Sequence, residues 1–141
     1  MLSGCFLFVR REALDEVGLL DERFFIYSED CDWCKRFNDS RWRVVFTPES
    51  EAIHLGEGSS SNAPTRFYLE MQKARFAYWE KHYGLFGKAY YASMLVLHEI
   101  IRLAAGSVLC VVDPRGRSKH GALVLRSVNC LLWLLGVQGG R

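Results

Sequence analysis

The sequence predicts an α/β segment followed by an α-helical tail. Up to residue 55, short apolar runs that suit strands alternate with segments of helical spacing. Beyond that point the patterned segments have the helical period, and two long apolar segments, residues 85–112 and 121–137, make up most of the tail. With 141 residues, 50% of them hydrophobic and 24% charged, the chain suits one ordinary globular domain rather than a disordered or collagen-like one.

The first strand and two helices are expected before residue 40. Residues 3–10, SGCFLFVR, form a short apolar run that suits a buried strand. Residues 10–18, RREALDEVG, change to helical spacing, and Gly18 is placed to end that helix. After the aromatic loop LLDERFFIY, Ser28 is the expected N-cap of a second helix that ends near residues 38–40.

Two further strands and another helix are expected next. WRVVFTP (residues 42–48) is strand-like and is stopped by Pro48, and SEAIHL (50–55) is a second short strand. The loop GEGSSSNAP (56–64) is built from turn residues. From Thr65 to His82 the apolar spacing predicts a helix.

Charge is divided unevenly along the chain. Residues 1–60 carry seven Lys/Arg and twelve Asp/Glu, a net charge of −5, whereas residues 61–141 carry eleven and four, a net charge of +7. The basic and apolar second part is therefore a candidate for contact with anions or anionic lipid. The five cysteines are odd in number and irregularly spaced, which favours reduced thiols in the cytosol over a secreted disulfide framework.

The polar residues of the tail bear on its relation to a membrane. Lys88, Tyr91, His98, Glu99 and Arg102 share about a third of a helical wheel in the first apolar segment. A charged group at the centre of a bilayer costs roughly 2.5–3.5 kcal/mol, so these residues favour a helix at the membrane surface over a spanning one. The basic turn DPRGRSKHG between the two segments suits phosphate headgroups. A soluble bundle with these helices in its core is an equally open alternative.

Three acids, Glu29, Asp30 and Asp32, stand at the start of the second predicted helix beside FFIY and Trp33. They have two interpretations. Acids in a first turn complement the helix dipole and form a solvated face. A carboxylate beside apolar surface is also poorly solvated, which suits a general base that takes a proton from a hydroxyl.

Cys31, Cys34 and His54 are the other candidates for chemistry. The two cysteines form a CxxC. A structural zinc site would need a second ligand pair at suitable spacing, which the sequence lacks. The neighbouring acids would raise the thiol pKa, which disfavours a reactive thiolate. His54 ends an apolar strand before a Gly/Ser loop, a frequent place for active-site groups. The sequence has no G-x-G-x-x-G, Walker or G-x-S-x-G motif.

Taken in order, these residues resemble a known family. The chain has a small-residue strand ending in Arg-Arg, then Gly-x-x-Asp-Glu-x-Phe-Phe-x-Tyr, an acidic pair with Asp two residues on and an Arg on the same helix. Trp-x-Val, a Pro and a His before a Gly/Ser loop follow. The pattern resembles the C-terminal half of the catalytic domain of family 2 glycosyltransferases, most closely the rhamnosyltransferase-like branch that works on bacterial cell-surface polysaccharides. Over residues 3–83 it implies a partial GT-A (nucleotide-diphospho-sugar transferase) fold.

The resemblance implies a role for each site residue. Asp30 would be the general base that deprotonates the acceptor sugar, Glu29 and Asp32 would position the acceptor or Asp30, and Arg36 would orient or neutralise the acids. His54 matches a histidine that joins the nucleotide-sugar metal site in some members. The implied reaction is inverting: a hydroxyl of a saccharide or lipid-linked acceptor attacks the anomeric carbon of a nucleotide-sugar donor, and the nucleoside diphosphate leaves from the opposite face. A divalent Mg²⁺ or Mn²⁺ would stabilise that diphosphate.

The family's N-terminal half, with its Asp-x-Asp metal motif, has no counterpart in this sequence; Asp30-Cys31-Asp32 fits the string but lies in the acceptor motif. We therefore expect residues 1–83 to be the acceptor-side part of a catalytic domain and residues 84–141 an amphipathic helical tail. Activity and metal binding are expected only with the missing half. The expected location is cytoplasmic, peripheral at the inner face of the cytoplasmic membrane. An anionic membrane surface is an expected partner, and nucleic acid is not. The alternative is a non-catalytic membrane-surface or interaction protein derived from a truncated transferase.

Overall fold

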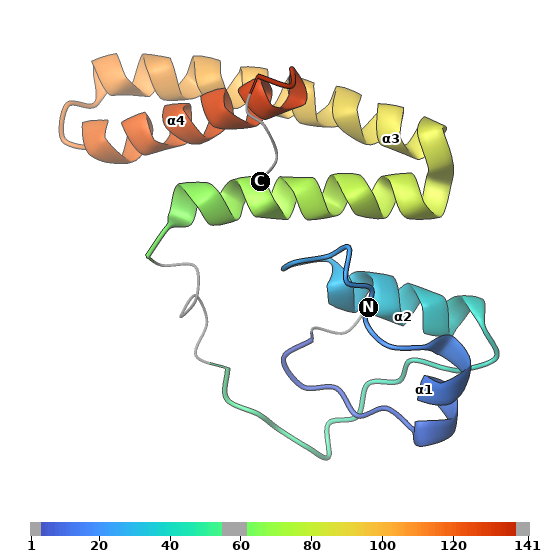
Figure 1. Ribbon diagram of the computed structural model, residues 1–141. Helices are drawn as coiled ribbons and strands as arrows, with labels where there is room; N and C mark the ends of the chain where they lie inside the picture. Colours follow the sequence, from blue (N-terminus) through green and yellow to red (C-terminus); the bar gives the residue numbers. More distant parts are fainter. Residues whose placement is uncertain (1–3, 55–61, 138–141) are drawn as a thin grey trace. The chain divides into compact units, whose positions relative to one another are not determined.

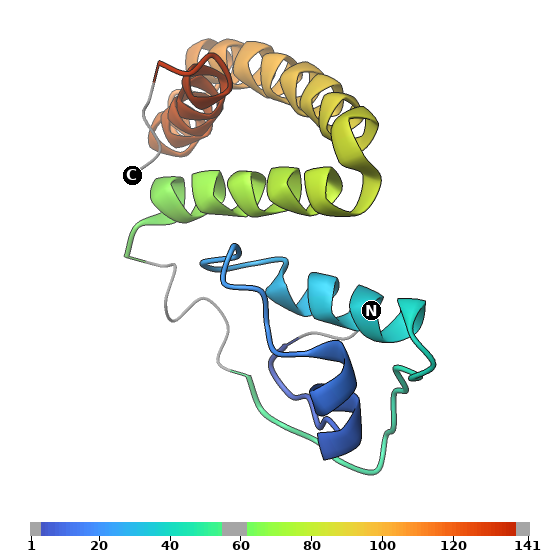
Figure 2. The ribbon, with the colours of Figure 1, turned by 45° about the vertical axis from the view of Figure 1, so that its right-hand side comes forward.

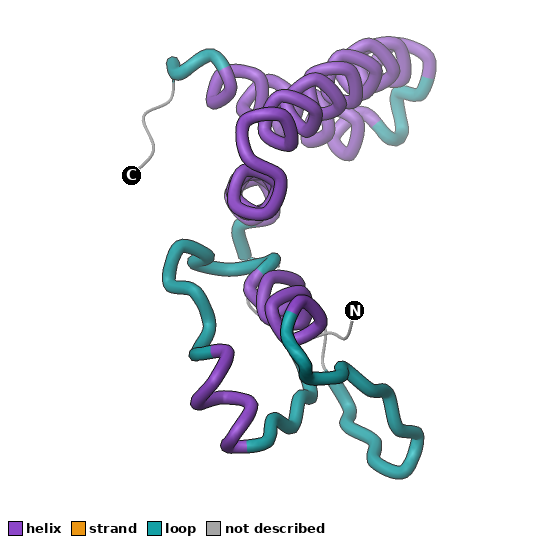
Figure 3. Tube along the Cα trace, turned by 90° about the vertical axis from the view of Figure 1, so that its right-hand side faces the viewer, coloured by secondary structure: helices purple, strands orange, loops and turns teal. Residues whose placement is uncertain are grey.

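The computed structural model describes residues 4–54 and 62–137 (Figure 1). The chain divides into two compact units, Met1–Ser61 and Asn62–Arg141, and each is described by itself. The first unit contains α1 (Arg11–Val17) and α2 (Glu29–Asp39), and the second contains α3 (Pro64–Val112) and α4 (Arg117–Leu134). Figure 3 shows these helices joined by loops, with no strand in the described ranges.

The predicted α/β architecture with a partial GT-A fold is wrong for the described residues. Residues 7–10, 42–47 and 50–54, all within predicted strands, have no regular structure, and Leu55 lies outside the described residues. A strand is stabilised by hydrogen bonds to a neighbouring strand and by packing of one face. Phe8, Val45 and Ile53 instead remain exposed. These segments have strand composition, but the described part of the chain offers them no sheet neighbour. Most of the predicted Gly/Ser loop, residues 56–61, also lies outside it.

Both helices predicted in the first unit are confirmed. α1 is followed by Gly18, whose φ of +85° lies in the left-handed region that glycine adopts without a Cβ clash. Ser28 stands at the N-cap position of α2 as predicted, but its side chain makes no capping hydrogen bond and its φ is +64°. Tyr27 has a φ of +67° as well. Two successive non-glycine residues therefore hold a conformation that costs on the order of 1–3 kcal/mol each.

The helix predicted over residues 65–82 is confirmed and continues into the tail, because α3 is one long helix with a break at Gly84. Gly84 has a φ of +64° and a ψ of −156°, which is not helical. The chain reverses there, as Figure 2 shows, and α3 forms a first arm (residues 64–83) and a second arm (residues 85–112). The predicted boundary between residues 83 and 84 falls at this break, although residues 62–83 belong to the same compact unit as the tail.

α4 runs along the second arm of α3, so three helical segments pack together (Figures 1 and 2). Gly106 permits the close approach, since a Cβ there would lie 2.9 Å from side-chain carbons of both Leu123 and Val124. The first arm joins the packing through Phe76, whose ring centroid is 5.4 Å from that of Trp133 in α4.

A buried carboxylate links the two arms of α3. Glu99 is 0% exposed, and its Oε1 accepts a hydrogen bond from the Tyr68 hydroxyl on the first arm. Arg102 donates to the same hydroxyl, and its Nη1 lies 3.9 Å from the Glu99 carboxylate. His98 Nδ1 lies 3.2 Å from Glu99 Oε1. Glu99, one of the polar residues that share a side of the helical wheel, therefore faces inward and contacts Tyr68.

The second arm leaves large apolar side chains exposed. Its most apolar 18-residue window has a mean hydropathy of 1.9 and is only 17% buried, and α3 is the one helix in the described ranges long and apolar enough to cross a membrane by length and composition. A soluble bundle would bury such side chains, so this surface favours membrane contact over the soluble-bundle alternative. The exposed side chains include Leu85, Phe86, Met94, Leu97, Ile100, Ile101, Val108, Val111 and Val112.

Removal of the Tyr68 hydroxyl should destabilise the second unit. Tyr68→Phe deletes a hydrogen bond to a carboxylate that has no access to water, so the free energy of unfolding should fall by about 1–3 kcal/mol. A urea titration followed by helical circular dichroism measures it. Tyr90→Phe is the matched control, because Tyr90 lies on the same helix but is 56% exposed. It should change the free energy by less than about 0.5 kcal/mol. Equal effects of the two changes would contradict a structural role for the Glu99 contacts.

Candidate functional site

Side chains of α2 bind three successive carbonyl groups at the end of α1. Arg36 donates from Nη1 to the Val17 oxygen at 2.8 Å and from Nη2 to the Leu19 oxygen at 2.7 Å. Trp33 donates from Nε1 to the Gly18 oxygen at 2.9 Å. Carbonyls at the end of a helix lack partners within it, and a guanidinium also complements the negative end of the helix dipole. We call these three contacts the carbonyl clamp; they fix α2 against the end of α1.

Asp32 holds Arg36 in place for the carbonyl clamp. Asp32 is 0% exposed, and its Oδ2 lies 2.9 Å from Arg36 Nε. Their i, i+4 spacing puts both on one side of α2. The pairing compensates a carboxylate that would be costly to bury alone. The structure therefore shows a structural task for Asp32 and Arg36, and their part in acceptor binding stays a prediction.

The Asp30 carboxylate is oriented by the backbone. Its Oδ2 accepts a hydrogen bond from the Gly4 N–H at 2.9 Å, and its Oδ1 accepts one from the Cys31 N–H at 2.7 Å. Asp30 is half-buried in the first turn of α2, where the partial positive charge of the helix N-terminus favours a negative group. A carboxylate has about four lone-pair sites, so each oxygen can still accept one more hydrogen bond.

Gly4 belongs to this arrangement, and the sequence analysis missed it. A Cβ at residue 4 would lie 3.2 Å from the Asp30 Cβ, so glycine lets the backbone N–H come close to the carboxylate. The signal for it was available in principle. A glycine within an otherwise apolar, strand-like run often marks a place where another group approaches the backbone closely.

Glu29 supplies a second, different carboxylate beside Asp30. Its Oε2 is buried and has no hydrogen-bond partner within residues 4–54 and 62–137. Buried polar atoms in native proteins almost always have a partner, so an orphaned one calls for an explanation. The start of α2 thus carries one carboxylate that the backbone orients and one buried acceptor oxygen that lacks a partner in the described ranges.

The two cysteines and His54 do not join this arrangement as reactive groups. Burial, with the nearby Asp30 carboxylate, raises the pKa of the Cys31 thiol to about 11, which keeps it protonated near neutral pH and agrees with the case against a redox dithiol. His54 is exposed, and no group of three or more metal-binding side chains occurs in the described ranges. Since Mg²⁺ and Mn²⁺ prefer several oxygen ligands, His54 does not fit such an ion by itself.

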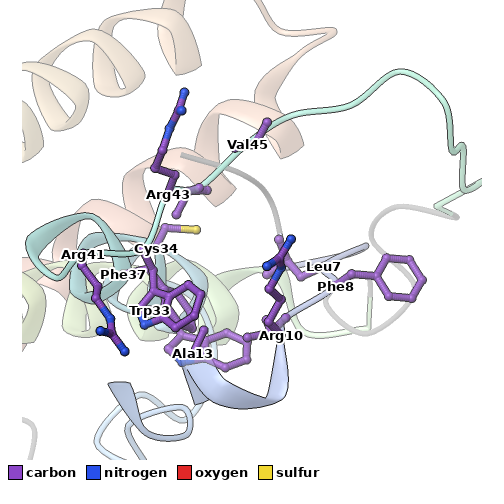
Figure 4. Close-up of a pocket in the computed structure, with 13 residues that line it drawn as sticks. Leu7, Phe8, Arg10, Ala13, Trp33, Cys34, Phe37, Arg41, Arg43 and Val45 are labelled. Atoms are coloured by element: carbon purple, nitrogen blue, oxygen red, sulfur yellow. The ribbon is translucent and has the colours of Figure 1, made fainter. Parts of the chain in front are cut away.

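A pocket of about 500 Å³ lies along α2 on the side of Trp33, Cys34 and Phe37 (Figure 4). Asp30 does not line it. Phe8 is 87% exposed and points away from the other side chains in Figure 4. Because the pocket lies between two segments with strand composition, we interpret it as uncovered packing surface rather than as the reaction site. Its remaining lining residues are Leu7, Val9, Arg10, Ala13, Arg41, Trp42, Arg43, Val44 and Val45.

Comparison with known proteins supplies a relative. The chain is 34% identical over 84 residues to the N-acetylglucosaminyl-diphospho-decaprenol L-rhamnosyltransferase of Mycobacterium tuberculosis, in strains CDC 1551 / Oshkosh and ATCC 25618 / H37Rv. The matched part of this chain is rhamnosyltransferase-like. That likeness confirms the resemblance seen in the sequence. No family model and no solved structure matches the chain.

The match covers 59% of this chain but only 27% of the rhamnosyltransferase. The chain therefore spans about a quarter of that relative's length, and the relative's activity, substrates and partners are proposals for this chain.

Breaking the carbonyl clamp should unfold the first unit more readily. Arg36→Gln removes the guanidinium from two carbonyls and leaves the buried Asp32 without its cation, so the free energy of unfolding should fall by about 3–5 kcal/mol. The neighbouring change Lys35→Gln removes the ion pair with Asp39, whose side chain is 57% exposed, and a pair of this kind is worth less than about 1 kcal/mol. Urea titration measures both, with Trp33 and Trp42 as the fluorescent probes after Trp79 and Trp133 have been changed to Phe. A loss at Arg36 no larger than that at Lys35 would refute the clamp.

Proposed function

We propose that this chain supplies the acceptor side of a glycosyltransferase in the synthesis of bacterial cell-surface polysaccharide. In the proposed reaction, a sugar moves from a nucleotide-sugar donor to a saccharide or lipid-linked acceptor with inversion. The likeness to a rhamnosyltransferase supports the reaction class. The observation that carries the proposal is the pair of carboxylates at the start of α2, with Asp30 oriented by two N–H groups and Glu29 left with a buried, unpartnered oxygen in the described part of the chain.

In this mechanism Asp30 takes the proton of the acceptor hydroxyl. The N–H groups of Gly4 and Cys31 hold the carboxylate in position, so little reorganisation is needed when the proton moves. As the proton passes to Asp30, the hydroxyl oxygen forms a bond to the anomeric carbon of the donor. The bond from that carbon to the diphosphate oxygen breaks at the same time, and the nucleoside diphosphate leaves with the electron pair.

Glu29 would orient the acceptor for this step. A second hydroxyl of the acceptor sugar could donate to its Oε2, which satisfies the orphaned atom and fixes the sugar beside Asp30. The left-handed residues Tyr27 and Ser28 immediately before α2 also support a functional use of this segment, because backbone strain of that kind clusters at active sites.

A divalent Mg²⁺ or Mn²⁺ would act on the donor side by stabilising the leaving diphosphate. His54 is the residue of this chain proposed to reach it, and only together with oxygen ligands from outside the described residues.

The proposed location is the cytoplasmic side of the membrane. The exposed apolar side chains of the second arm would contact lipid, and the basic turn that follows suits an anionic surface. The relative's name describes a substrate linked to decaprenol through a diphosphate, which fits an acceptor held in a membrane. No observation favours the non-catalytic alternative.

Loss of the Asp30 carboxylate should abolish most turnover. The test uses a chimaera in which the matching part of this chain replaces its counterpart in the mycobacterial rhamnosyltransferase. There Asp30→Asn should lower kcat by roughly 10²–10⁴-fold while the KM for the donor changes little, as expected for a lost general base. Asp39→Asn, the same change at the exposed end of α2, is the matched control and should leave kcat within about twofold. Near-normal turnover of the Asp30→Asn enzyme would remove Asp30 from the role.

Glu29 should affect acceptor binding rather than the chemical step. In the same chimaera, Glu29→Ala should raise the KM for the acceptor about tenfold, because one hydrogen bond to a charged group is lost. Glu29→Gln keeps a carbonyl oxygen as acceptor and should restore much of that loss. Steady-state kinetics with the donor and the acceptor varied separately distinguish the two effects. An unchanged acceptor KM in Glu29→Ala would refute the contact.

A further inference from the structure

The turn between α3 and α4 carries a pocket lined by cations. Its volume is about 580 Å³. Lys119 and Arg126 lie two helical turns apart on one side of α4, and Arg115 reaches it from the turn. The other lining residues are Gly116, Ser118, Ala122 and Leu123, so no carboxylate lines the pocket within residues 62–137.

The nearest acid in the sequence is engaged elsewhere. Asp113 is the only Asp or Glu between residues 100 and 141. Its Oδ2 lies 3.0 Å from Nε2 of His120, and its Oδ1 accepts the Gly116 N–H at 3.1 Å. The hydrogen bond with His120 and, to a smaller extent, that with the Gly116 N–H lower the pKa of Asp113. Asp113 therefore remains ionised, and its two contacts stabilise the turn. Asp113 does not line the pocket, so it does not pair with the three cations there.

One of these cations has a buried donor without an acceptor. Nε of Arg126 is inaccessible to solvent and has no hydrogen-bond partner in the described part of the chain. A guanidinium N–H that is removed from water without an acceptor costs free energy. An anion in the adjoining pocket would supply oxygen atoms to this side chain.

We propose that the pocket binds a phosphate or diphosphate group, carried there by a lipid. The oxygens of such a group would accept hydrogen bonds from the guanidinium groups of Arg115 and Arg126, the ammonium group of Lys119 and the hydroxyl of Ser118. The N-terminus of α4 adds a favourable dipole to these side chains. The proposal concerns the second unit alone and does not depend on the transferase reaction.

The surroundings of the pocket favour a phosphate that carries an apolar chain. Val108, Val111 and Val112 are exposed at the end of α3 that leads into the same turn. An acyl or prenyl chain attached to the bound phosphate would therefore find apolar surface within the same unit. A free phosphate would use the pocket and leave that surface exposed to water.

The test measures binding of the complete 141-residue chain to vesicles by sedimentation. Phosphatidylcholine vesicles contain either phosphatidic acid or oleate, adjusted to equal surface charge, so that only the first offers an accessible phosphate monoester. The variants are Arg126→Gln and Lys119→Gln. Arg117→Gln is the matched control, because Arg117 lies in the first turn of α4 but donates to the Cys110 carbonyl instead of lining the pocket. Circular dichroism checks that each variant keeps its helices.

The pocket variants should lose more binding than the control. Loss of one surface charge near an anionic membrane lowers binding about fivefold, which is the expectation for Arg117→Gln. Loss of a direct charge-assisted contact should lower binding to phosphatidic acid by roughly 10- to 100-fold in Arg126→Gln, and Lys119→Gln tests the same contact if Arg126→Gln does not fold. Binding to oleate vesicles should fall equally in all three variants.

Soluble pyrophosphate distinguishes the two sources of phosphate. If a lipid carries the group, pyrophosphate should compete only weakly with phosphatidic acid vesicles. Strong competition that depends on Arg126 would assign the pocket to free phosphate and overturn the lipid source. Equal losses for the pocket variants and Arg117→Gln, or equal binding to phosphatidic acid and oleate, would overturn the site itself.

Discussion

The guanidinium group of Arg36 is the contact on which the first unit depends. It accommodates the carbonyl oxygens that α1 leaves unpaired at its end, and the buried carboxylate of Asp32 holds it there. A guanidinium group has five donors spread over three nitrogens, so it can serve two carbonyls and a carboxylate that lie apart, whereas a lysine has its three donors on a single nitrogen. Trp33 and Arg36, in the middle and later part of α2, fix the helix against α1. Glu29 and Asp30 at its start are therefore not needed for that packing. The task of Asp32 is thus separated from that of Asp30, although the two stand in one short motif.

The second unit also depends on a buried carboxylate, that of Glu99, which here joins two arms of one helix rather than two helices. Glu99 gathers Tyr68 and Arg102 between the arms of α3. Gly84 makes this possible, because without the reversal the two arms would form one straight rod and Tyr68 would lie far from Glu99. In the sequence, Glu99 and Arg102 argued against a spanning helix, and the cost of their charges is reduced by this internal pairing.

The helices could be predicted from the sequence, whereas the strands that it predicts do not form in the described residues, and the difference has a physical reason. A helix satisfies its own backbone and shows its buried face every three or four residues, so α1, α2 and the arms of α3 follow from local pattern. A strand needs a neighbour that composition cannot supply, and residues 7–10 and 42–47 have none in the described part of the chain. The acids Glu29 and Asp30 could be singled out from their apolar setting. The task of Arg36 could not, because it depends on carbonyl groups 17 and 19 residues away in the sequence, and the approach of Gly4 to Asp30 had only the glycine itself as a signal.

The inward-facing Glu99 has a consequence for the solvent in which the second unit is stable. Its polar contacts lie inside and much of its large apolar surface lies outside, which reverses the arrangement of a water-soluble bundle. In water such a surface favours self-association. In lipid, apolar surface gains nothing from leaving the solvent, and small residues and interhelical hydrogen bonds become the main source of helix pairing. The contact of Tyr68 with Glu99 and the close approach at Gly106 are interactions of that kind. The same fold would thus be held together by different forces in the two media, and only in lipid would its polar interior decide how the helices pair.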